Sequence, residues 1–192
     1  LTSWLGKHPN IYFSPIKEPH YFYGDASRKF VKIKNRSNYE KLFSGVLPHH
    51  HAIGEASVYY LFSKEAVNNI LRIFPNSKFI VLLRNPIEMA ISVHWQELYS
   101  ENEHISDFEK AWNLQTFRIH GKKTRRKCKE PKHLLYGELC KLGDQMERLY
   151  ETVSRERVHS IFLEEMASAP NQVFRDVLRF LDVDDTFSVD FI

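Results

Sequence analysis

One stretch, residues 78–94 (KFIVLLRNPIEMAISVH), runs from an apolar strand directly into a helix. Residues 79–83 are continuously apolar, which is typical of a parallel strand that is covered on both faces. Asn85-Pro86 then ends the strand and opens a helix with proline in its first turn. Arg84 therefore lies at the carboxyl end of a strand, where open α/β sheets bind their ligands, and its planar guanidinium suits phosphate oxygens.

Ser92 follows Arg84 by eight residues, two turns into this helix, and adds a hydroxyl on the same side. Together the two side chains predict a phosphate site. Plainer interpretations stay open: Arg84 caps the helix or pairs with Glu88, and Ser92 is a small residue at a helix contact.

Strands and helices alternate along the rest of the chain. We predict strands at 10–13, 52–61, 78–83 and 158–163, and helices at 1–7, 39–43, 64–74, 86–99, 105–119, 134–153 and 171–181. This order predicts an α/β fold in three layers, with a central, mainly parallel sheet and helices on both faces.

Composition agrees with a single domain spanning residues 1–192, because a chain that is 43% hydrophobic can bury one sizeable core. A net charge of +3 is too small to predict nucleic-acid binding by the whole chain. The longest apolar run is far shorter than the roughly 20 residues that span a bilayer. We expect a soluble domain without a transmembrane segment, cytoplasmic if the protein is bacterial, with its compartment otherwise unassigned.

Three segments, in this order along the chain, resemble the sulfotransferases that use 3'-phosphoadenosine 5'-phosphosulfate (PAPS). They are HPNIYFSPIKEPHYFYGD at residues 8–25, the Arg84 and Ser92 pair, and VHSIFLEEMASAPNQVFRDVLRFLDV at 158–183. The style is closest to bacterial and glycosaminoglycan-type members. The resemblance implies a P-loop NTPase-like sulfotransferase fold, PAPS as co-substrate, adenosine 3',5'-bisphosphate (PAP) as product, no metal, and an acceptor hydroxyl or amine, with carbohydrate among the candidates.

The same resemblance implies a catalytic group in the KEPHYF segment. Glu18 occupies the position of the family's catalytic glutamate, which makes it the first candidate for the general base, with Lys17 beside it. His20 is the second candidate, because imidazole titrates near neutral pH. A charged, exposed turn before Pro19 is the plain alternative. Asp25 either helps to orient the acceptor or only starts a turn.

Nucleotide contacts follow in the same way. The resemblance assigns the 3'-phosphate to Arg84 and Ser92 and, more loosely, assigns a nucleotide contact to Tyr136, which precedes Gly137. Family members also hold the 5'-phosphosulfate in a glycine-rich loop, and no such loop occurs in these residues. We expect the first strand and that loop to lie before Leu1, and a further C-terminal part to follow Phe191.

Other candidate features have plain interpretations beside the functional ones. The run at residues 121–133 carries seven lysines and arginines; it is either a solvated loop or a recognition surface for an anionic acceptor or the nucleotide. His49 to His51 point in different directions, so we expect no metal site there. Cys128 and Cys140 are two ordinary thiols or, alternatively, one disulfide.

Two other functions compete with sulfuryl transfer. A P-loop-type phosphotransferase shares the anion-binding logic but needs a complete glycine-rich GK[ST] loop and a magnesium-binding carboxylate, and neither is visible. The second competing function is that of a catalytically silent domain, which binds sulfated or acidic partners through residues 122–132. We expect an enzyme of the EC 2.8.2 type.

Overall fold

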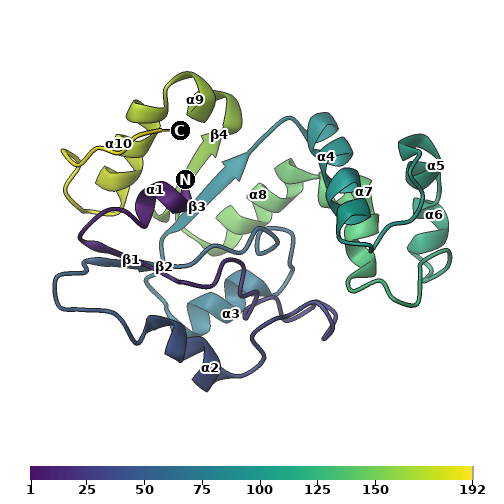
Figure 1. The fold of residues 1–192 in the computed structure, drawn as a ribbon, viewed down its shortest axis with the longest axis horizontal. Coiled ribbons are helices and arrows are strands. Elements are labelled where there is room, and N and C mark those ends of the chain that lie inside the picture. Colours follow the sequence, from purple (N-terminus) through teal and green to yellow (C-terminus); the bar gives the residue numbers. More distant parts are fainter. Residues whose placement is uncertain (192) are drawn as a thin grey trace.

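The computed structural model of the protein describes residues 1–191, whose regular structure is drawn in Figure 1. Its strands form two parallel pairs: β1 (Ile11–Phe13) with β2 (Ala52–Gly54), and β3 (Phe79–Leu83) with β4 (Val158–Phe162). The longer pair runs in register from Phe79 opposite Val158 to Leu83 opposite Phe162. Parallel pairing confirms the predicted kind of sheet, but in the described residues the sheet consists of two separate pieces.

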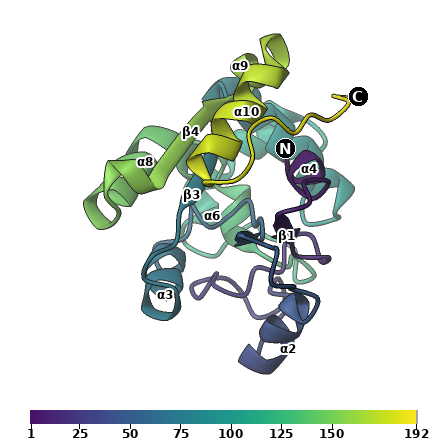
Figure 2. The ribbon, with the colours of Figure 1, turned by 90° about the vertical axis from the view of Figure 1, so that its left-hand side faces the viewer.

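Helices cover both faces of the β3–β4 pair. On one face, Ile80 and Ile161 belong to a core completed by α1 (Thr2–Leu5) and α10 (Pro170–Phe180). On the other face, Val81 packs with α3 (Ala66–Ile73) and α8 (Leu142–Thr152). Alternating strand residues point to opposite faces, so one apolar strand serves both cores. The predicted three-layer α/β fold is confirmed, and Figure 2 shows α10 and α3 in different layers.

The remaining helices fill the connections. They are α2 (Arg36–Glu40), α4 (Pro86–Tyr99), α5 (Phe108–Asn113), α6 (Gln115–Arg118), α7 (Tyr136–Leu139) and α9 (Leu163–Ser168), with short 3-10 turns at Lys41–Phe43, Pro131–Leu134 and Arg155–Arg157. Figure 1 shows α4 to α7 gathered at one end of the molecule. A separate core fills that end, with Ala90, Ala111, Leu134 and Tyr136 among its buried members.

Several predicted boundaries are wrong. The strand expected at 52–61 ends at Gly54, because residues 55–60 turn away to bind another loop. The helix expected at 105–119 begins only at Phe108, where the Asp107 side chain accepts from the Lys110 N–H and caps it. It then divides into α5 and α6.

The helix expected at 134–153 is likewise divided, into α7 and α8. Lys141 leaves the helical conformation, with φ −73° and ψ 60°. The side-chain amide of Gln145 donates to the carbonyl of Leu139 at 2.9 Å, which satisfies an acceptor that the break leaves free. Amphipathic spacing continues across the break, which is why the sequence does not reveal it.

No helix among residues 1–191 is long and apolar enough to cross a membrane. Cys128 and Cys140 are both buried, free thiols, so the disulfide alternative is not present in this structure.

Candidate functional site

The first cluster of predicted residues lies in the loop that follows β1, residues 17–23, which we call the Glu18 loop. The Nζ atom of Lys17 lies 3.8 Å from one Glu18 carboxylate oxygen, and the Nε2 atom of His20 lies 3.5 Å from the other. The Glu18 side chain is 26% exposed, so it can meet a ligand. The structure therefore brings together all three residues that the KEPHYF segment singled out.

Electrostatics keeps the Glu18 carboxyl ionised. The interaction with the His20 ring is the main cause that lowers the Glu18 pKa; burial opposes it, and the positive charges of Lys17 and Lys32 add to it. The amine of Lys32 also binds the carbonyl oxygen of Lys17 at 3.3 Å, which brings this second cation to the loop. An ionised carboxylate is the form that accepts a proton.

His20 has a different environment from Glu18. It is 1% exposed, and its ring lies 4.7 Å from the Phe30 ring and 5.8 Å from the Tyr59 ring, measured between centroids. A histidine packed in this way cannot contact a bulky acceptor directly. Its Nε2 atom faces the Glu18 carboxylate, with which it pairs.

The second cluster lies where β3 ends and α4 begins. Asn85 caps α4, since its side chain accepts from the Ile87 N–H at 2.9 Å, and Pro86 occupies the first turn. Arg84, at the strand end, has a side chain that is 32% exposed. Its Nε atom is buried and has no hydrogen-bond partner in residues 1–191, so the described chain leaves this donor unsatisfied.

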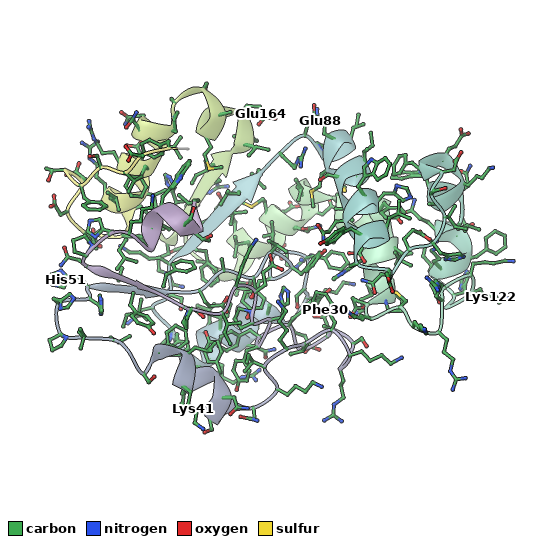
Figure 3. All side chains as sticks on the ribbon, in the orientation of Figure 1. Phe30, Lys41, His51, Glu88, Lys122 and Glu164 are labelled. Carbon is green, nitrogen blue, oxygen red and sulfur yellow. The ribbon has the colours of Figure 1, made fainter. Side chains whose placement is uncertain are left out.

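Ser92 continues the same face of α4. One guanidinium nitrogen of Arg84 lies 3.6 Å from a Glu88 carboxylate oxygen, and the exposed Ser92 follows one turn beyond Glu88. Figure 3 shows Glu88 and Glu164, which follow β3 and β4, along the same edge of the molecule. No hydrogen bond or ion pair within the described chain connects Arg84 directly to the Glu18 loop.

Tyr136 lies away from solvent. It is 0% exposed, and its hydroxyl donates to Glu103 at 2.8 Å beneath α4. Glu103 in turn forms a fully buried ion pair with Arg118 at 2.6 Å. The ring would have to leave this core to contact a nucleotide, so the structure does not bring Tyr136 together with Arg84 and Ser92 at an accessible surface.

Asp25 and the basic run are linked. The Asp25 carboxylate accepts from the Ser63 hydroxyl and lies 3.2 Å from the amine of Lys132, the last lysine of the run. Burial raises the Asp25 pKa, but these two partners outweigh it and lower the pKa. A surface hollow of about 620 Å³ in this region is lined by four other cations, Lys29, Arg126, Lys127 and Lys129.

Sequence reasoning missed Ser57 and Tyr60, whose hydroxyls accept from backbone N–H groups of the Glu18 loop, and Glu55, to which both hydroxyls donate. The signal would have been a charged residue immediately after a predicted strand, which is also the signal that singles out Arg84. The sequence predicts a strand that continues to residue 61, which places Glu55 inside the strand and conceals that signal.

Comparisons with known proteins assign the chain to a family. The family model described as "Sulfotransferase family" matches residues 21–187, and the chain belongs to the sulfotransferase family. The crystal structure of a sulfotransferase from Alicyclobacillus acidocaldarius is similar at 30% sequence identity and a TM-score of 0.83, covering 97% of this chain and 76% of that one. The protein is thus a transferase of the sulfotransferase class that acts on an acceptor substrate.

A sulfotransferase domain from the curacin biosynthetic pathway is more distant. It has 19% identity and a TM-score of 0.49, over 79% of this chain and 44% of that one. No curated protein matches the sequence.

Proposed function

We propose that the protein transfers the sulfuryl group of PAPS to a hydroxyl or amine of an acceptor by in-line displacement. Arg84 and Ser92 bind the 3'-phosphate in this proposal. The observation that carries it is the partly exposed Arg84 side chain at the end of β3, whose buried Nε atom has no partner in residues 1–191. A guanidinium in this position can donate paired N–H hydrogen bonds to the oxygens of a phosphate.

Glu18 is the general base. It removes the proton of the acceptor as the acceptor oxygen or nitrogen forms a bond to sulfur, while the bond from sulfur to the phosphate oxygen breaks and PAP leaves. PAPS supplies the activated sulfuryl group. Lys17, whose side chain is 80% exposed, can turn toward the transferred group and offset the negative charge that develops there.

Tyr136 is not among the contacts that we propose for the nucleotide, because its hydroxyl already donates to Glu103 in the core. The acceptor is proposed only as a hydroxyl or amine compound, with carbohydrate among the candidates. The proposal needs no metal, since the reaction depends on positioning and on the cations of the protein.

Calorimetric titration with PAP, and with AMP as the ligand that lacks the 3'-phosphate, tests the nucleotide site. We expect PAP to bind more tightly than AMP, and Arg84→Ala to weaken PAP binding by about 2 kcal/mol or more, as for a lost charge-assisted fork. Arg72→Ala, at an exposed arginine of α3, is the matched control. Equal PAP affinity in wild type and Arg84→Ala removes Arg84 from the site.

A further inference from the structure

The backbone of the Glu18 loop adopts an unusual conformation. Glu18 and His20 have φ angles of 55° and 54°, in the left-handed region that residues with a side chain rarely occupy. Each such residue costs on the order of 1 kcal/mol or more, so the surrounding structure must stabilise the loop. Since these two residues form the pair on which the proposed base depends, whatever holds the loop also sets its chemistry.

Three backbone N–H groups hold the loop against residues 56–60. Glu18 donates to the carbonyl of Ala56 at 3.1 Å, as in a sheet. The next two acceptors are side chains: His20 donates to the Ser57 hydroxyl at 3.1 Å, and Phe22 donates to the Tyr60 hydroxyl at 3.2 Å. Alternate residues of the loop are thus bound, and two of the three bonds end on hydroxyl oxygens.

A hydroxyl accepts reliably only when its own proton has another partner, because the O–H group can rotate. The carboxylate of Glu55 supplies that partner twice. The Ser57 hydroxyl donates to one Glu55 oxygen at 3.0 Å, and the Tyr60 hydroxyl donates to the other at 2.7 Å. One carboxylate therefore directs the lone pairs of both hydroxyls toward the loop.

We propose that Glu55 is a positioning residue for sulfuryl transfer, which holds the Glu18 loop in its catalytic conformation through the hydroxyls of Ser57 and Tyr60. The inference rests on the proposed function, in which Glu18 is the base. Glu55 directly follows β2, so a rigid element places it. Both of its oxygens are already bonded, which favours action through the loop over direct contact with the acceptor.

The arrangement predicts an effect on the pH dependence of turnover. The charged and titratable groups that face Glu18 are Lys17, Lys32, His20 and Tyr59. His20 makes the largest contribution to the lowered Glu18 pKa, and its N–H bond to Ser57 fixes its place. If the loop relaxes and His20 moves away, the Glu18 pKa rises toward its ordinary value and activity is lost at a higher pH on the acid side.

The test is Glu55→Gln, which keeps the shape but offers one acceptor oxygen where the carboxylate offers two. We expect turnover to fall about tenfold to a hundredfold, as for a misplaced catalytic group, with PAP affinity unchanged. The acid limb of the pH profile should move to higher pH, and amide hydrogen exchange at His20 and Phe22 should become faster. Ser57→Ala should reproduce these changes. Ser57→Thr keeps the hydroxyl and should therefore have the turnover of wild type.

Glu40→Gln, at an exposed carboxylate paired with Arg36, is the matched control and should behave as wild type. Wild-type turnover and exchange in Glu55→Gln would overturn the inference, and so would a loss of turnover accompanied by lower PAP affinity and a lower melting temperature. Failure of the proposed function is distinguishable: Glu18→Gln would then be as active as wild type, whatever Glu55→Gln does.

Discussion

At the scale of single residues, Glu18 is held between two nitrogen-bearing side chains and still reaches solvent. Glu18→Gln keeps the shape of the side chain and removes its basicity. We expect PAP affinity to be unchanged and turnover to fall on the order of a hundredfold or more, which is the usual contribution of a general base. Steady-state kinetics beside calorimetry separates the two quantities; turnover equal to that of wild type would show that Glu18 is not the general base.

Glu88 places a negative charge beside the proposed phosphate site. Its carboxylate lies 3.6 Å from the Arg84 guanidinium, so a bound phosphate must compete with it. Glu88→Gln removes the competitor, and we expect tighter binding of PAP by about twofold to fivefold, in the range of a partly exposed ion pair. AMP affinity should stay nearly constant. A weaker PAP affinity in this variant would show that Glu88 orients Arg84 rather than competing with its ligand.

At the scale of elements, the end of the molecule formed by α4 to α7 depends on a buried ion pair. Arg118 and Glu103 approach to 2.6 Å with both side chains 0% exposed, and Tyr136 donates to the same carboxylate. Glu103→Gln leaves the guanidinium without its counter-charge, and we expect a loss of about 3–5 kcal/mol in the free energy of unfolding. Glu138→Gln, at an exposed pair with Lys141, should cost less than about 1 kcal/mol.

Chemical denaturation at two pH values completes this prediction. Burial raises the Glu103 pKa, but the bonds from the backbone N–H groups of His104 and Ile105, from Tyr136 and from Arg118 outweigh it, so the folded pKa is lowered. A lowered folded pKa means that the stabilisation is present above the ordinary value of 4.5 and is lost as the pH falls through the folded pKa. The difference in the free energy of unfolding between wild type and Glu103→Gln should therefore become smaller in acid. Equal free energies of unfolding at neutral pH would contradict the prediction.

Elements whose ends depend on local signals were predictable from the sequence. The helix at 86–99 agrees with α4 because Asn85 and Pro86 define its start within the chain itself. The end of β2 was not predictable, since residues 55–60 leave the sheet to bind the Glu18 loop, a contact between distant segments. The resemblance identified the residues of the Glu18 loop. It did not identify Glu55, because the link from Glu55 to the loop through Ser57 and Tyr60 is likewise a contact between distant segments.

At the scale of the whole molecule, the two strand pairs raise a question about the sheet. β1 and β2 contribute to the same core as β3 and β4, beneath α1 and α10, yet in residues 1–191 the pairs are not hydrogen bonded to each other. Ile53 of β2 is 55% exposed and Leu82 of β3 is 45% exposed, which is unusual for apolar side chains of central strands. We propose that a strand preceding Leu1 completes the sheet and carries the phosphosulfate loop.

A protein extended at its N-terminus by any residues encoded before Leu1 tests this proposal. A parallel strand placed between the pairs would satisfy unpaired backbone groups and cover apolar surface, so the extended protein should melt at a higher temperature. A loop with free N–H groups at the end of that strand would bind the 5'-phosphate, so PAP affinity should rise more than tenfold, or about 1.4 kcal/mol. The rise should persist when Arg84 is replaced by alanine, because the loop and Arg84 bind different phosphates. If the extended chain has the melting temperature and PAP affinity of residues 1–192, the preceding residues do not complete this sheet, and the two strand pairs are a feature of the fold itself.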